Sequence, residues 1–69
     1  MNIDIRKYII NNFKDDDIKD IRKSIEDSIQ TKDDDTLIGL GVFFELMWNN
    51  SNQETKINIL KTIRKGLDI

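Results

Sequence analysis

The apolar stretch over residues 37–48 constrains the fold of this chain more than any other feature. It contains one charged side chain, Glu45, and two glycines, Gly39 and Gly41. Apolar and polar residues do not alternate in it, which disfavours a strand, and a helix of this composition is apolar almost all round. Gly41, Glu45 and Asn49 form its one polar stripe, at a spacing of four. We therefore expect a central helix that other helices pack around and cover.

The length of the chain limits how well such a helix can be covered. A chain of 69 residues forms one small domain, which buries only about 60% of the surface that its unfolded chain exposes. The sequence has no Pro and only three Gly, so long segments are free to be helical. It predicts one all-α domain over residues 1–69, a small bundle of four short helices around the central apolar helix.

Apolar residues spaced three or four apart predict the other three helices. Polar clusters at 15–17, 33–35 and 49–52 separate the segments. The patterns predict helices near residues 3–13, 17–30, 36–49 and 52–66. Their apolar faces consist of Ile5, Ile9 and Phe13 in the first, Ile18, Ile21, Ile25 and Ile29 in the second, and Ile57, Leu60, Ile63 and Leu67 in the fourth.

Several residues are typical of helix ends or helix contacts. The aspartates at 15–17 and 33–35 precede helices, where carboxylates accept hydrogen bonds from free amides and meet the positive end of the helix dipole. Ser51 and Glu54 have the spacing of a capping box, and Gly66 lies where a left-handed residue would stop the fourth helix. Gly39 and Gly41 indicate close approach of a neighbouring helix backbone. The start of the third helix, between 34 and 38, is left open.

Composition excludes several classes of function. The chain has no Cys and no His, and so lacks the usual zinc ligands and the usual general base near neutral pH. Its 13 acidic and 11 basic side chains give a net charge of −2, which argues against specific coating of nucleic acid. We predict that the protein is not an enzyme and that it has no catalytic residues, metal ligands or cofactor. Whether Glu45 is buried is left open.

Among possible metal sites, a calcium-binding loop has a partial match in the sequence. Asp34, Thr36, Gly39 and Glu45 occupy four of the positions of an EF-hand loop. Ile38 occupies another ligand position and has no side-chain oxygen, and the stretch reads as apolar helix. The match therefore does not predict a calcium site.

Two surfaces are candidates for contacts with partners. A thin domain need not cover every side of residues 37–48, and leftover apolar area favours a homodimer or a partner helix. Phe43, Met47 and Trp48 are the candidate partner surface. Lys61 and Lys65 share a face of the fourth helix and are candidates for weak nucleic-acid contact. The simpler interpretation of this face is that it is exposed to solvent and binds nothing.

No apolar run reaches the roughly 20 residues of a membrane span, and nothing resembles a signal peptide, so we expect a cytoplasmic-type compartment and no membrane contact.

Residues 37–48, Leu-Ile-Gly-Leu-Gly-Val-Phe-Phe-Glu-Leu-Met-Trp, resemble the signature stretch of a known family. The chain is similar to the minor small acid-soluble spore proteins of type I from endospore-forming bacteria. The likeness runs without gaps from Asn2 to about Leu67, with Ile38 where the family usually has Pro. The resemblance implies a non-catalytic protein that is made in the forespore, stored in the spore core and has a structural or interaction role. It implies neither DNA coating nor any catalytic residue.

A second interpretation stays open beside the resemblance. The chain can be a small helical protein–protein interaction module that forms a homodimer through residues 37–48. A partner can also be another protein of the spore core. The sequence identifies neither the molecular role in the spore, nor the oligomeric state, nor any such partner.

Overall fold

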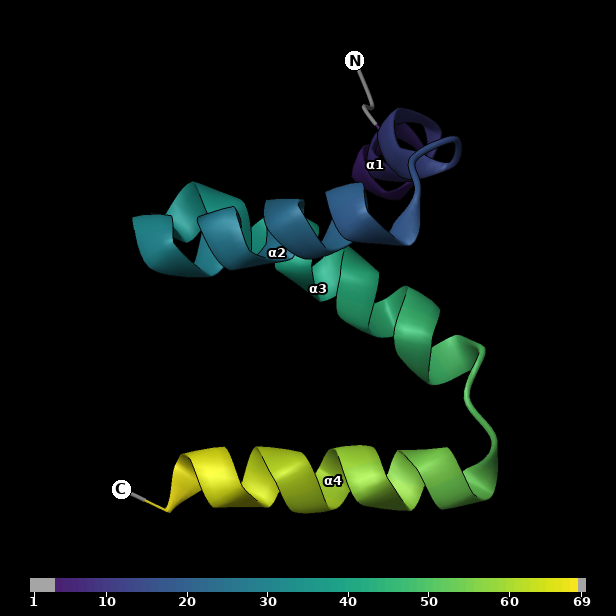
Figure 1. Cartoon of the computed structure of the whole chain (residues 1–69), viewed down its shortest axis with the longest axis vertical. Helices are drawn as coiled ribbons and strands as arrows, with labels where there is room; N and C mark the ends of the chain where they lie inside the picture. Colours follow the sequence, from purple (N-terminus) through teal and green to yellow (C-terminus); the bar gives the residue numbers. More distant parts are fainter. Residues whose placement is uncertain (1–3, 69) are drawn as a thin grey trace.

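Four α-helices form the computed structural model, which describes residues 4–68 (Figure 1). They are α1 (Ile5–Phe13), α2 (Ile18–Thr31), α3 (Asp34–Asn49) and α4 (Gln53–Leu67). The predicted all-α class with four helices is confirmed. The predicted start at residue 3 lies outside the described residues, and every other predicted helix end lies within two residues of the observed one. None of the helices within residues 4–68 has the length and apolar character needed to cross a membrane.

Aspartates begin the first three helices. Asp17 accepts a hydrogen bond from the backbone N–H of Asp20 at 2.9 Å, and Asp33 accepts one from the N–H of Asp35 at 3.0 Å. Asp4 is the corresponding residue of α1. The capping role predicted for both acidic clusters is confirmed, and α3 begins directly after Asp33, which settles its open start.

The fourth helix begins differently from the prediction. Its N-cap is Asn52, whose side chain accepts a hydrogen bond from the N–H of Thr55 at 2.8 Å. The Ser51 hydroxyl instead donates to the carbonyl of Met47 at 2.6 Å and so satisfies the end of α3. The predicted capping box between Ser51 and Glu54 is wrong, because the preceding helix engages the serine.

The glycines do not have the roles that the sequence suggested. Gly66 lies inside α4, and the one residue of 4–68 with positive φ is Lys32, at 53°, directly after α2. A β-carbon on Gly41 would meet nothing within 4 Å, and one on Gly39 would lie 4.0 Å from Cδ1 of Ile9. The predicted close backbone approach at these glycines is wrong, because the atom nearest to Gly39 belongs to the side chain of Ile9 and the space beside Gly41 is open.

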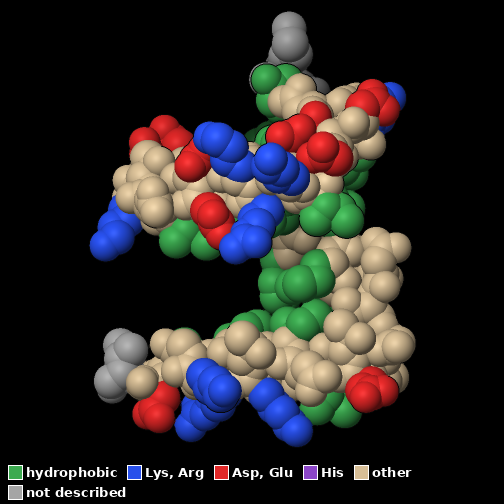
Figure 2. All heavy atoms as spheres, viewed as in Figure 1, with side chains coloured by type: hydrophobic (Ala, Val, Ile, Leu, Met, Phe, Trp, Pro, Cys, Tyr) green, Lys and Arg blue, Asp and Glu red, His purple; other side chains and the backbone are tan. Residues whose placement is uncertain are grey.

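Helix α3 lies in the middle of the fold and packs most extensively against α2 and then α1. Figure 1 shows α4 on the other side of the end of α3, set apart from α1 and α2. Figure 2 shows that side chains leave an open hollow between α2 and α4. The radius of gyration is 13.4 Å, whereas a compact domain of this length has about 11 Å. The central position of α3 is confirmed, but the molecule is open on one side.

The expectation that α3 would be covered is wrong. Val42, at 6% exposure, is the one buried residue within 4–68. The large aromatic side chains of α3 are only partly covered, since Phe43 and Trp48 are half-buried and Phe44 is 40% exposed. The cause is the path of α4, which leaves α3 beyond Asn50 and does not fold over it.

Candidate interaction surface

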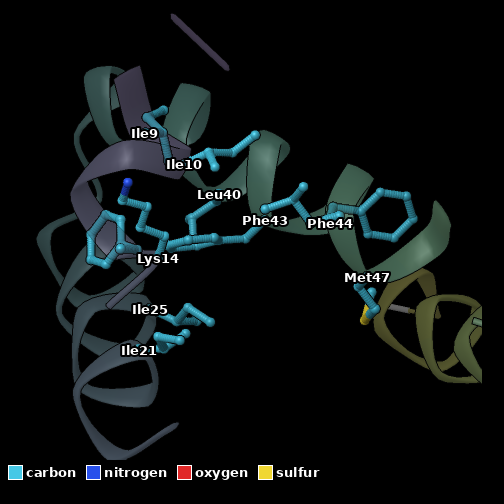
Figure 3. Close-up of a pocket in the computed structure, with 11 residues that line it drawn as sticks. Ile9, Ile10, Lys14, Ile21, Ile25, Leu40, Phe43, Phe44 and Met47 are labelled. Carbon is cyan, nitrogen blue, oxygen red and sulfur yellow. The ribbon is translucent and has the colours of Figure 1, made fainter. Parts of the chain in front are cut away.

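An apolar groove opens between α1, α2 and the second half of α3 (Figure 3). We call it the α1–α3 groove, and its volume is about 550 Å³. Figure 3 shows side chains from all three helices around it. Its lining comprises Ile9, Ile10, Phe13 and Lys14 of the α1 region, Ile21 and Ile25 of α2, and Leu40, Phe43, Phe44, Leu46 and Met47 of α3. Lys14 is the one charged residue of this lining.

The apolar faces of α1 and α2 and the largely apolar surface of α3 explain the groove. Ile21 and Ile25 are one turn apart on α2 and lie on the same face. Leu40, Phe43 and Met47 repeat at three and four along α3 and form the opposite wall. A helix that presents an apolar face needs another apolar surface against it, and here the three faces meet at an angle that leaves space between them.

Two aromatic pairs lie along α3, and one of them joins it to α1. The rings of Phe13 and Phe43 lie edge to face, with centroids 5.0 Å apart and an interplanar angle of 73°. Phe44 and Trp48 are stacked, with centroids 5.9 Å apart. Edge-to-face and offset-stacked arrangements are the favourable ones for aromatic side chains. The first pair fixes α1 on α3, and the second runs along the open side of α3.

The structure separates the three residues of the candidate partner surface. Phe43 and Met47 line the α1–α3 groove, and Met47 is exposed. Trp48 is not among the lining residues and instead lies under Lys56, whose Nζ is 5.2 Å from the ring centroid. Sequence reasoning missed Phe44 and the isoleucines of α1 and α2 as groove residues, although the apolar faces predicted for those helices already contained Ile21 and Ile25.

An ion pair joins Arg6 of α1 to Glu45, which belongs to the polar stripe of α3. Nε of Arg6 donates to Oε2 of Glu45 at 2.7 Å, and Nη2 donates to Oε1 at 2.8 Å. The side chains are 67% and 45% exposed, so Glu45 is not buried. The hydrogen bond from Arg6 lowers the pKa of Glu45, and desolvation opposes the shift. The sequence singled out Glu45 but contained no signal for its partner, because the two residues are far apart in the chain.

The charged side chains fall into an acidic and a basic part. Residues 15–35 contain nine acids and four cations, whereas α4 contains four cations and one acid, Glu54. Figure 2 shows the blue side chains along α4 on the side away from the hollow. Lys61 and Lys65 are exposed on α4, and their contact with nucleic acid stays a prediction.

The partial EF-hand match cannot form a loop. Its residues from Asp34 to Glu45 lie within the helix α3, so their side chains point in several directions around the helix. In the described part of the chain, no three acidic side chains are grouped so that they could hold a metal ion.

Comparison with known proteins gives one consistent result. The family model described as small, acid-soluble spore protein I matches residues 3–67. A protein of that name from Halalkalibacterium halodurans is 34% identical over 67 residues, which cover 97% of this chain and 98% of that protein. One from Bacillus subtilis is 33% identical over 67 residues, with 97% and 94% covered. One from Bacillus cytotoxicus is 31% identical over 67 residues, with 97% and 96% covered. No solved structure gives a significant match.

Proposed function

We propose that this chain, which belongs to the small, acid-soluble spore protein I family, is a non-catalytic protein of the spore core with a structural or interaction role. The match over residues 3–67 is the observation that carries the proposal. It confirms the family resemblance seen in residues 37–48, and relatives of similar length carry the same name. Family membership associates the chain with sporulating bacteria and their spores, and the location in the forespore and spore core is part of the proposal.

The charge composition supports solubility in acid. Below about pH 3 most carboxylates are protonated, and the 11 Lys and Arg side chains then dominate the charge. Molecules with a large charge of one sign repel each other and stay in solution. All the cations on α2 and α4 except the half-buried Lys56 are exposed, which is consistent with this behaviour.

The α1–α3 groove supports a role in binding rather than catalysis. Its lining is apolar apart from Lys14. Such a surface favours contact with another apolar surface, whereas general acid–base or nucleophilic catalysis needs titratable groups within hydrogen-bond reach of the substrate. The groove is therefore suited to packing against a helix.

The time and place of synthesis test the proposal. An antibody against the protein should detect it in forespores late in sporulation and in purified spores, and acid extraction should release it from broken spores. A cytoplasmic protein of vegetative growth serves as the control for fractionation. Signal in vegetative cells together with its absence from forespores would contradict the spore assignment.

A further inference from the structure

We propose that the protein is a homodimer in which the apolar face of α4 from each copy packs in the α1–α3 groove of the other. This inference goes beyond the proposed function and does not depend on it. The occupant of the groove is a second copy of the chain, and the contact is reciprocal, as expected for a two-fold dimer.

The exposed surface is too large for a stable small monomer. The solvent-accessible area is 6355 Å² for a chain of 8.1 kDa. A compact monomer of that mass exposes about 4,500 Å², so the excess is about 1,900 Å². A standard protein–protein interface buries about 800 Å² on each partner. The excess is more than enough for one such interface.

Helix α4 has an apolar face that nothing in its own chain covers. Ile57, Leu60 and Ile63 are all exposed, and Leu60 is 53% exposed. Figure 2 shows hydrophobic side chains on the side of α4 that faces the hollow and on the side of α2 opposite it. An isolated helix of this length is marginal in water, so α4 needs a surface to pack against.

The link between α3 and α4 directs α4 away from the groove of its own chain. The side-chain amide of Asn50 donates to the carbonyl of Leu46 at 2.7 Å, and the Ser51 hydroxyl donates to that of Met47 at 2.6 Å. Asn52 caps α4. All three linking residues are thus held by hydrogen bonds, and the direction of α4 is set away from the groove.

The position of Lys56 strengthens the same junction. Its Nζ lies 5.2 Å from the ring centroid of Trp48, within the range of a cation–π interaction. Folding α4 back onto its own groove would break this contact together with the hydrogen bonds of the link. A second copy can fill the groove without breaking them.

Charge near the ends of α2 favours α4 as the occupant. Helix α4 contains four cations and one acid, whereas α2 itself contains three of each, and the acidic excess of residues 15–35 lies in the two clusters that flank α2, at 15–17 and 33–35. Opposite charges across an interface steer association and select the partner. A second copy brings a basic helix close to these acidic clusters, with apolar faces between them.

The mass in solution tests the proposal. Light scattering coupled to size exclusion should give twice 8.1 kDa for the full chain at neutral pH, at concentrations from micromolar to submillimolar. Leu60→Asp should raise the dissociation constant about tenfold or more, with helicity retained by circular dichroism because Leu60 is exposed in the single chain. Asn58→Asp, on the opposite face of α4, is the matched control and should stay dimeric. A wild-type protein that is monomeric throughout this range would overturn the proposal.

Cross-linking distinguishes α4 of the second copy from α4 of the same chain. The chain has no Cys, so Ile21→Cys and Leu60→Cys can be introduced in separate proteins and mixed. A short bismaleimide should join the two variants, and Asn58→Cys in place of Leu60→Cys should give little product. Cross-linking confined to a single chain that carries both cysteines would overturn the proposal. Failure of the dimer would leave the spore assignment unaffected, because the sporulation experiment does not depend on oligomeric state.

Discussion

Arg6 of α1 and Glu45 of α3 form a two-point ion pair across 39 positions of sequence. Both carboxylate oxygens accept hydrogen bonds from the guanidinium, at 2.7 and 2.8 Å. Such bidentate pairs specify geometry as well as attraction. Together with the edge-to-face contact of Phe13 and Phe43, the pair sets how α1 lies on α3 and therefore shapes one wall of the α1–α3 groove.

Glu45→Gln should reduce the acid sensitivity of folding. The pKa of Glu45 is lowered from its ordinary value of 4.5, chiefly by the hydrogen bond from Arg6. Because the folded-state pKa is depressed, ionised Glu45 stabilises the fold above about pH 4.5, and this stabilisation is lost as pH falls through the folded pKa. Urea unfolding at fixed protein concentration, from neutral pH to about pH 2, should show a smaller loss in the variant. Glu54→Gln is the control, and equal pH dependence in Glu45→Gln and wild type would contradict the prediction.

Asp17→Ala should destabilise the protein by about 1 kcal/mol, because the N-cap of α2 is lost. Asp17→Asn keeps a capping oxygen and should cost little. The negative charge of Asp17 is the main cause of the raised pKa of Asp20, so both variants should bring that pKa down towards its ordinary value. Denaturant unfolding measures the stability, and NMR titration of Asp20 measures the pKa. An unchanged pKa of Asp20 in both variants would show that another group causes the shift.

Gly41→Ala should stabilise the fold by about 0.5–1 kcal/mol, because Gly is a poor residue for a helix interior. A β-carbon at this position meets nothing within 4 Å. Gly39→Ala is the matched comparison, in which the new methyl group makes ordinary contact with Ile9. Thermal unfolding measures both changes. A destabilised Gly41→Ala variant would mean that another helix backbone lies against Gly41, as the sequence alone suggested.

The contact between Phe13 and Phe43 should be measurable as a coupling energy. Phe13→Leu and Phe43→Leu keep apolar side chains but remove the edge-to-face geometry. A double-mutant cycle should give a coupling of about 0.5–1.5 kcal/mol. Phe44→Leu combined with Phe13→Leu is the control, since Phe44 pairs with Trp48, and it should show nearly additive effects. Additivity in the Phe13–Phe43 cycle would contradict the prediction.

The helices and most of their starts follow from local sequence. The periodic isoleucines of α2 and the aspartates at 17 and 33 act within a few residues of one another, so their effect is readable without knowledge of the fold. The same holds for the ion pairs of Arg22 with Glu26 and Lys23 with Asp27, each formed at 3.0 Å between residues one helical turn apart. The apolar character of residues 37–48 likewise placed α3 in the centre.

The candidate site depended on relationships that local sequence does not contain. Which face of α1 meets α3, and hence the pairing of Arg6 with Glu45, depends on the angle between helices. Ser51 had two competing hydrogen-bond partners, and the end of α3 took precedence over the start of α4.

The periodicity of a helix determines which of its side chains share a face, and for this chain the sequence alone was sufficient to determine that. It does not determine what that face meets, because burial depends on the direction in which each helix leaves the previous one. Three residues, Asn50 to Asn52, direct α4 away from α3. The tertiary structure therefore decided that the apolar central helix is partly exposed and that the α1–α3 groove is open.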